Sequence, residues 1–341
     1  MGILSLFKKN SSSKSQFDWR NSKAHLLLLS KYLHANSYEY FAQHDYWKAM
    51  WDKVLGESAK KAINRFVDEG ILIPPEVKDL VSYKYKVTEL KDMLRERSLP
   101  VSGRKEKLVE MLTQEDPGGM IKLVAGLSLL ICSQSGRMIA EQYLEAEKEK
   151  RAKVENQVMK YLSTRMFREI SQIIFEYETE QVFPSGFGVG LETEKESRSS
   201  EQDIAMLTSI FQSKPKILTK LENGTLEAIR IAAAMTMLFG EPRAKKYLPD
   251  DLNTGLPYDS ETVVRMFRFY ISNEGHLARY RKSKLQYIKV LPSPDSCESC
   301  KKLEGIRYPL DKVPELPNEN CTHEMGCRCT YIPVVDSLSS E

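Results

Sequence analysis

The chain has 341 residues, a formal net charge of +3 and 28% charged residues. This length allows two or three domains with a sizeable core, and the near-balanced charge excludes nucleic-acid binding through a positive field over the whole protein. Any contact with nucleic acid must therefore come from a local patch.

The first residues predict neither export nor membrane insertion. In residues 1–9 the apolar positions precede Lys8 and Lys9, which is the reverse of a secretory signal. The longest apolar run, residues 123–132, is too short to cross a bilayer, which needs about 20 residues. We therefore expect a cytoplasmic protein without a membrane partner, with a flexible basic tail at residues 1–16.

Residues 17–135 predict a helical N-terminal domain. Residues 62–70 read as a helix closed by Gly70, and residues 71–75 leave it in extended form. Residues 121–132 predict a strand that turns into a further helix near Arg137. The aromatic side chains expected in the core of this domain are Tyr32, Tyr38, Tyr40, Tyr46 and Trp47.

Within this domain, residues 86–112 predict two short helices separated by a loop. Apolar residues recur at helical spacing in both halves, and residues 99–103 interrupt the pattern. Thr88 and Ser102 are the expected N-caps of the two helices. The apolar pairs are Leu90 with Leu94 and Leu108 with Leu112.

Basic side chains crowd the predicted start of the second helix, at Arg104, Lys105 and Lys107. Cations at this end oppose the helix dipole, whereas the free backbone N–H groups there suit a phosphate. From Lys84 to Leu112, eight Lys or Arg residues face five Asp or Glu residues. The alternative is an ordinary helical hairpin with a solvated basic face.

This segment resembles a SAP motif, the helix, extended loop, helix module of DNA-associated proteins. The resemblance runs through Val87, Leu90, Leu94, Leu99-Pro100, Ser102-Gly103-Arg104-Lys105, Leu108 and Leu112. It implies double-stranded DNA held mainly by its backbone and groove shape, with little base reading. The candidate DNA contacts are Lys86, Lys91, Arg97, Ser102, Gly103, Arg104, Lys105 and Lys107.

The middle of the chain predicts helices joined by a linker. Apolar residues at a spacing of four predict one long helix over residues 136–183, acting as a spacer or packing arm. Residues 184–202 are rich in Gly, Ser and Glu and predict a linker. Residues 203–290 predict a second helical region that ends in a short strand.

Five of the six cysteines lie in residues 297–329, which in a reducing compartment favours metal binding over disulfides. Cys297 and Cys300 can fix one edge of a tetrahedral site, and alternate residues of an extended strand place Cys327 and Cys329 on one side. We therefore expect a structural zinc module at residues 291–336. Six candidates compete for four positions: Cys297, Cys300, Cys321, His323, Cys327 and Cys329.

Residues 260–335 also resemble the C-terminal part of the phage Mu F-like head morphogenesis family. The matching residues are Cys297, Cys300, Leu303-Glu304-Gly305, Pro309-Leu310, Pro314, Cys327-Arg328-Cys329 and Pro333. This chain departs from the family in carrying Cys321 and a longer gap between His323 and Cys327. The resemblance implies a small metal-stabilised module in a virion or prophage setting, not a reaction.

The sequence thus predicts a mainly α, multi-domain helical protein with a SAP-like hairpin and a C-terminal zinc-binding module. The expected function is non-enzymatic binding of double-stranded DNA, with the zinc module serving stability or a protein partner. One alternative is a phage-derived structural or assembly protein. The other is a metal-dependent nuclease, for which Glu298, Glu304 or Glu324 would supply a base.

Overall fold

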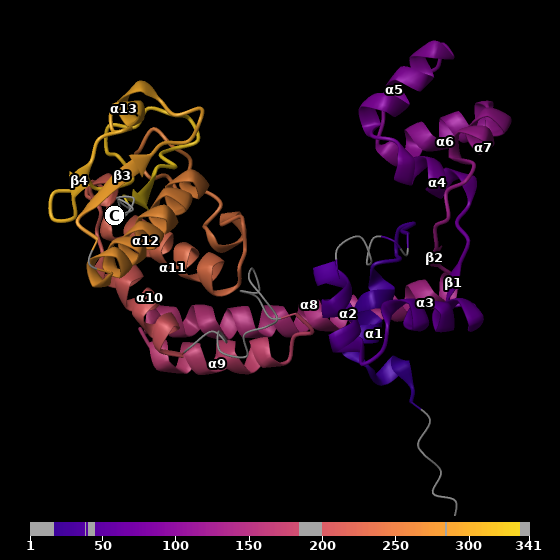
Figure 1. The fold of residues 1–341 in the computed structure, drawn as a ribbon, viewed down its shortest axis with the longest axis horizontal. Helices are drawn as coiled ribbons and strands as arrows, with labels where there is room; N and C mark the ends of the chain where they lie inside the picture. The colour runs from indigo at the N-terminus through magenta and orange to yellow at the C-terminus, as the bar shows by residue number, and fades with distance from the viewer. Residues whose placement is uncertain (1–16, 38, 40–44, 184–199, 284, 335–341) are drawn as a thin grey trace, which may run out of the picture. The chain divides into compact units, whose positions relative to one another are not determined.

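The computed structural model describes residues 17–37, 39, 45–183, 200–283 and 285–334. The chain divides into two compact units, Met1–Lys150 and Arg151–Glu341 (Figure 1). The described residues are mainly helical, which confirms the predicted fold class. The predicted tail at residues 1–16 and residues 184–199 of the predicted linker lie outside the described residues.

The first unit contains α1 to α7, the beginning of α8 and two short strands. Their bounds are α1 Lys23–Ser30, α2 Asp45–Leu55, α3 Ala59–Asp68, β1 Leu72–Ile73, α4 Val77–Lys84, α5 Val87–Glu96, α6 Lys105–Glu115, α7 Pro117–Val124, β2 Ile131–Cys132 and α8 Gln134–Ser163, with a short 3-10 helix at Trp19–Asn21. No described helix is long and apolar enough to span a membrane.

The aromatic residues of this unit divide between core and surface. Tyr32 is fully buried, as predicted. The prediction that Tyr46 and Trp47 belong to the core is wrong, because they are 42% and 48% exposed. Helix α2 turns Met50 and Trp51 inward instead. Tyr38 and Tyr40 lie outside the described residues.

The two short strands pair with each other just after the end of α3. Helix α3 ends as predicted, with Gly70 at φ +67°. β1 then pairs antiparallel with β2, placing Leu72 opposite Cys132. The residue before β1 approaches the start of α8 so closely that position 136 requires a glycine. A Cβ on Gly136 would lie 2.3 Å from the carbonyl oxygen of Ile71.

The strand predicted over residues 121–132 is mostly wrong. Residues 121–124 belong to α7, and only Ile131 and Cys132 form a strand. The helix forms because the Asp116 carboxylate accepts the N–H of Gly119 at 2.8 Å, and because Pro117 suits the first helical position. This local cap decides the conformation of a sequence that is also tolerant of strand.

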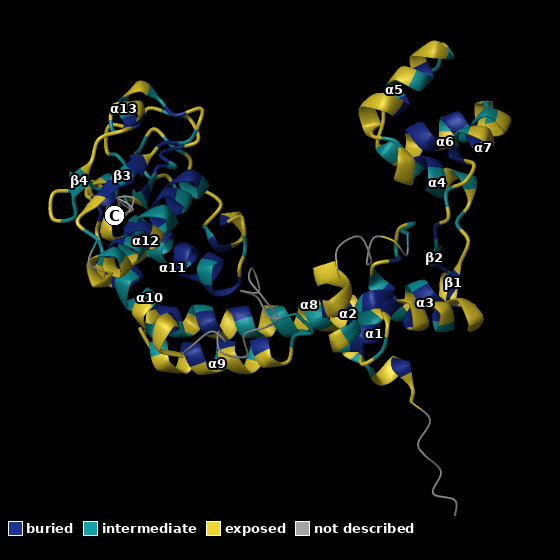
Figure 2. Cartoon of the chain, in the orientation of Figure 1, coloured by how far each residue is buried: buried dark blue, intermediate teal, exposed yellow. Residues whose placement is uncertain are grey.

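Helices α4 to α7 form a small bundle around their own apolar core. The four predicted leucines of α5 and α6 are fully buried, and α4 and α7 contribute Val81 and Met120. Figure 2 shows buried and exposed residues alternating along α5 and α6, as an amphipathic pattern requires. The predicted hairpin is thus confirmed, with two flanking helices that share its core.

The single long helix predicted over residues 136–183 is wrong, because the structure has two helices there. Helix α8 ends at Ser163 and α9 spans Phe167–Thr179. Arg165 takes φ +61° between them, a conformation that no α-helix continues through. The predicted apolar spacing still holds for Val158, Leu162, Ile170 and Ile174, which are fully buried, but not for Met166, which is 37% exposed beside the break.

The second unit packs helices against a small sheet. Its elements after α9 are α10 Ser200–Gln212, α11 Asn223–Leu238, α12 Ser260–Lys282, β3 Tyr287–Leu291, α13 Glu298–Lys301, β4 Tyr308–Pro309 and β5 Thr330–Pro333, with 3-10 helices at Lys216–Leu218 and Lys245–Tyr247. Residues 200–202, predicted as linker, belong to α10. The strand order is β4-β3-β5, with β3 antiparallel to both neighbours.

A buried carboxylate lies inside the second unit. Glu155 on α8 accepts from Arg151 Nε at 2.8 Å, from Lys246 Nζ at 2.8 Å and from the Tyr247 hydroxyl at 2.9 Å. Burial opposes ionisation of Glu155, but these three donors together lower its pKa. The network links α8 to the segment after α11.

Candidate nucleic-acid interface and metal centre

The loop between α5 and α6 reverses the direction of the chain and leads into α6. After α5 ends, Ser98 takes φ +56° and the Leu99 N–H returns to the Leu94 carbonyl at 2.9 Å. Leu99 and Val101 pack against the bundle core. Gly103 takes φ +132°, and a Cβ there would lie 3.1 Å from Cδ of Lys107.

This geometry corrects both predicted N-caps. Helix α5 begins at Val87 with Lys86 as N-cap, so Thr88 is already inside the helix. Helix α6 begins at Lys105 with Arg104 as N-cap. Ser102 cannot serve because Gly103, in the left-handed region, separates it from the helix.

Among the described residues, the start of α6 lacks the carboxylate hydrogen bond found at the starts of α5 and α7, although the first three N–H groups of α5 also have no acceptor. At α5 the Glu89 carboxylate accepts the Lys86 N–H at 2.6 Å, and Asp116 caps α7. Among the described residues, no acceptor meets the N–H groups of Lys105, Glu106 or Lys107. Three donors at the positive end of a helix dipole therefore face outward.

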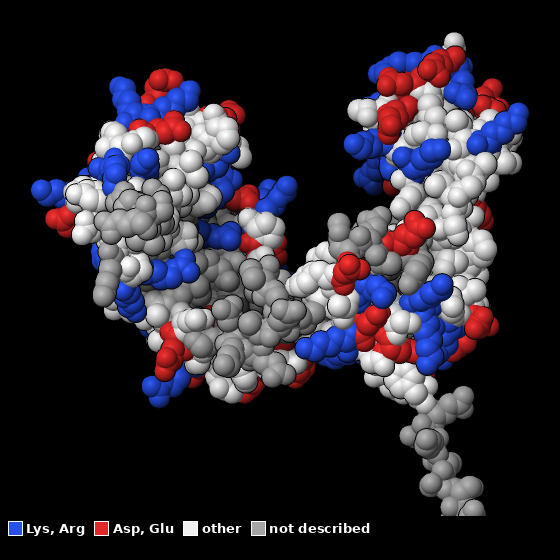
Figure 3. Space-filling model, viewed as in Figure 1, with Lys and Arg blue, Asp and Glu red and all other residues white. Residues whose placement is uncertain are grey.

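Most candidate DNA contacts lie on the surface of the bundle. The exposed ones are Lys86, Ser102, Gly103, Arg104 and Lys107, and the half-buried ones are Lys91 and Lys105. None of the five lysine and arginine residues among them has an ion-pair partner in the part of the chain that the structure describes. Figure 3 shows blue and red side chains interleaved over the region of α5 to α7.

Arg97, the remaining candidate, holds the bundle together. Its Nη2 donates to Asp116 Oδ2 at 2.7 Å and its Nη1 donates to the Met93 carbonyl at 3.0 Å. The hydrogen bond from Arg97, followed by that from the Gly119 N–H, lowers the pKa of Asp116. One carboxylate thus fastens the end of α5 and caps α7, a role that the sequence reasoning missed.

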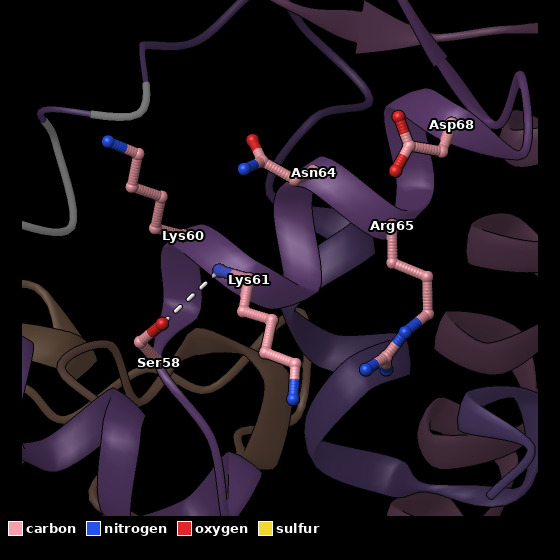
Figure 4. A pocket seen from close by; sticks show the side chains of 6 residues that line it. All are labelled: Ser58, Lys60, Lys61, Asn64, Arg65 and Asp68. Atoms are coloured by element: carbon pink, nitrogen blue, oxygen red, sulfur yellow. Dashed lines mark hydrogen bonds between the residues drawn. The ribbon is translucent and has the colours of Figure 1, made fainter.

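A shallow pocket on α3 also carries basic side chains, as Figure 4 shows. Its cations are already engaged: Arg65 lies 2.7 Å and Lys61 3.5 Å from Glu57 carboxylate oxygens. Ser58 caps the helix by accepting the Lys61 N–H at 3.3 Å. The pocket therefore offers no open anion site comparable to the start of α6.

The second site lies at the C-terminal end, where three segments bring five cysteines together. Cys297 precedes α13 and Cys300 lies within it, one helical turn away. Cys321 follows a turn in which its N–H bonds to the Asn318 carbonyl. Cys327 and Cys329 lead into β5, and Asn273 of α12 donates to the Cys329 carbonyl at 3.2 Å.

The distances between sulfurs suit a tetrahedral metal ion. Cys297 Sγ lies 3.8 Å from Cys321 Sγ, and Cys300 Sγ lies 3.8 Å from Cys327 Sγ. A zinc ion with Zn–S bonds of about 2.3 Å gives a tetrahedral edge of about 3.8 Å, whereas a disulfide needs about 2.05 Å. All six cysteines of the chain are free thiols. The cluster could hold a metal ion such as zinc.

Backbone N–H groups point at the sulfurs from the surrounding turns. Thr322 donates to Cys297 Sγ at 3.4 Å and Asn318 donates to Cys327 Sγ at 3.3 Å. Burial opposes ionisation of Cys297, but the Thr322 and Cys300 N–H groups outweigh it and lower its pKa to about 6. Burial raises the pKa of Cys300 instead. A bound cation would favour the thiolate form of both.

His323 lies outside the sulfur cluster. Its Nδ1 accepts the Met325 N–H at 3.0 Å, and its Nε2 lies 3.4 Å from an Asp295 carboxylate oxygen. Arg328 donates to the same carboxylate. The groups of described side chains close enough to share an ion contain cysteines alone. The ring of His323 therefore forms a hydrogen bond within the turn that runs from His323 to Gly326.

Comparison with known families identifies one part of the chain. The family model for the SAP domain matches residues 84–115, which the structure shows as α5, its loop and α6. A SAP domain suggests nucleic-acid binding. No curated protein and no solved structure matches the chain. No comparison supports the resemblance to the phage Mu F-like family, which stays a prediction.

Proposed function

We propose that this chain is a non-enzymatic protein that binds double-stranded DNA through its SAP domain. The observation that carries the proposal is the start of α6, where three N–H groups without acceptors among the described residues lie beside Arg104, Lys105 and Lys107. A phosphate there would accept from the amides and neutralise the cations that oppose the helix dipole.

The interface favours DNA backbone over base sequence. Its charged groups are lysine and arginine side chains on a short helical bundle, which suit phosphate oxygens. Gly103 keeps the loop backbone close to the stem of Lys107, where an added Cβ would lie 3.1 Å from Cδ. We therefore expect the affinity for DNA to fall steeply with salt concentration and to depend only weakly on base sequence.

We further propose that the cysteine cluster holds structural zinc. The three-stranded sheet is small, and two of its strands have only two and four residues. Sites rich in thiolates are usually closed structural sites, so we assign the metal to stability of residues 291–336 or to a protein partner. Catalysis by this metal is not part of the proposal.

A salt titration of duplex binding tests the DNA assignment. Replacing Arg104→Ala together with Lys105→Ala removes two phosphate contacts, so the plot of log affinity against log salt should become shallower by about two. Affinity should fall similarly for unrelated duplex sequences, because the lost contacts do not read bases. Fluorescence anisotropy with two labelled duplexes provides the measurement.

The matched control replaces another adjacent basic pair at a helix start, Lys60→Ala with Lys61→Ala on α3. This pair changes the net charge equally and should leave the slope unchanged. Equal slopes for the wild type and the α6 variant would refute the proposed interface. Cleavage of the duplex that stops on chelation would favour the nuclease alternative instead.

A further inference from the structure

The five clustered sulfurs fall into two groups that share one member. Cys297, Cys300 and Cys321 lie within 4.8 Å of one another, and so do Cys300, Cys327 and Cys329. Cys300 is thus the only described cysteine that belongs to both groups. Each group has three members, and each contains one of the two sulfur pairs 3.8 Å apart.

One tetrahedral ion would use only part of this arrangement. Zinc in a structural site takes four ligands, so a single ion leaves one of the five sulfurs without a metal partner. Four of the five cysteines are less than 9% exposed, so uncompensated charge in this cluster would be costly. If all five cysteines ionise, one divalent ion leaves three negative charges and two ions leave one, whereas a cysteine left out of a single site would stay a neutral thiol.

The surrounding hydrogen bonds serve both groups. Thr322 N–H points at Cys297 in the first group, and Asn318 N–H points at Cys327 in the second. The Asn318 side chain also lies 3.7 Å from Cys300 Sγ, the shared atom. Donors of this kind orient and stabilise thiolate ligands.

We propose that the centre holds two zinc ions bridged by the Cys300 thiolate, a statement that rests on the proposed metal-binding function. Cys297 and Cys321 hold one ion with Cys300, and Cys327 and Cys329 hold the other with the same sulfur. The five sulfurs thus supply three ligands to each ion, and the fourth ligand is not one of these cysteines. Cys300 is the one ligand whose loss disrupts both ions.

Native mass spectrometry of the full-length chain, purified with zinc present and then desalted, tests the proposal. The wild type should carry two zinc ions per chain. Cys329→Ser removes a ligand of one ion only and should lower the number to one. Cys300→Ser should remove both. Cys132→Ser, which changes the buried cysteine of the first unit, is the control and should retain two ions.

The wild-type number alone decides the matter if Cys300→Ser fails to fold. One zinc ion per wild-type chain would overturn the bridged centre and leave the proposed structural zinc standing. No bound zinc would overturn both. Two ions that persist in Cys329→Ser would place the second ion elsewhere and would also overturn the proposal. Titration of the metal-free chain with cobalt(II) should reach its sulfur-to-cobalt absorption plateau at two equivalents.

Discussion

The SAP domain and the cysteine cluster build their sites in opposite ways. In the SAP domain the fully buried leucines of α5 and α6 form a core, and the functional groups are exposed amides and basic side chains. In the C-terminal module the functional sulfurs are themselves buried among the core residues. If the proposed zinc is present, we expect the first site to keep its fold without its ligand and the second to depend on its ligand for folding.

This difference separates what salt and chelators should do. Exposed cations bind phosphate through electrostatic interactions that salt weakens. A metal held by buried thiolates would contribute its binding energy to folding. Treatments that act on one site should therefore leave the other intact, and the following experiments test that separation in order of expected effect.

Chelation should have the largest effect. Removing structural zinc costs binding energy on the order of 10 kcal/mol, so β3 and β5 should lose protection from hydrogen exchange. Helices α5 and α6 should keep theirs, because no cysteine lies in their core. Hydrogen exchange by mass spectrometry measures both regions together, and added zinc should restore the protection. Unchanged hydrogen exchange in β3 and β5 after chelation would contradict the proposed dependence of this module on zinc.

Glu155→Ala should destabilise the helices of the second unit by about 2 kcal/mol. It leaves Arg151 and Lys246 without their shared carboxylate, although both cations stay partly exposed and so limit the cost. Glu145→Ala on the same helix is the control and should cost less than about 0.5 kcal/mol, because its ion pair with Lys148 is exposed. Chemical denaturation followed by circular dichroism compares the two. Equal losses would show that the buried network has no special role.

Gly103→Ala should destabilise the bundle of α4 to α7 by about 1 kcal/mol. An alanine at φ +132° is strained, and its Cβ crowds Lys107. Gly118→Ala lies in α7 with open space around the added Cβ, so it should stabilise the bundle by about 0.5 kcal/mol. Hydrogen exchange in α5 to α7 reports both changes. The same sign for both variants would contradict the role of the loop geometry.

The smallest predicted effect is the dependence of stability on pH through Asp116. Arg97 lowers the pKa of Asp116 below its ordinary value of 3.8, so this carboxylate stabilises the fold above that value. The stabilisation is lost as pH falls through the lowered pKa. Asp116→Asn should therefore be less stable than the wild type at neutral pH, with the difference shrinking in acid. Thermal unfolding across this range measures it, and Glu115→Gln, an exposed neighbour, should match the wild type throughout. A constant difference would exclude ionisation of Asp116 as its cause.

The sequence predicted the apolar framework better than the helix ends. The spacing of Leu90, Leu94, Leu108 and Leu112 predicted their burial because side-chain periodicity directly reports which helix face meets a core. The caps were wrong because a cap depends on the loop conformation, and nothing in Ser102 reveals that Gly103 adopts φ +132°. The break at Arg165 was missed for a similar reason, since this left-handed residue is not a glycine.

Among the six candidate ligands that the sequence offered, the five that lie together are the cysteines, without His323. Cys297 and Cys300 lie at the start of α13, whereas Cys327 and Cys329 alternate in the segment just before β5 rather than in a strand as predicted. His323 depends on which way its turn faces, and there its ring bonds to the Met325 N–H. Arg97 illustrates the same limit, because its partner Asp116 is close only after α5 and α6 have packed.

The two cores also differ in how far apart along the chain their members lie. Every member of the core shared by α4 to α7 falls between Val77 and Leu127, whereas the second core runs from Val154 to Tyr331. Contacts that are local in sequence form quickly, and chains fold from the N-terminus during synthesis. A growing chain can therefore complete its SAP domain on the ribosome before the cysteines that close the other half have been made.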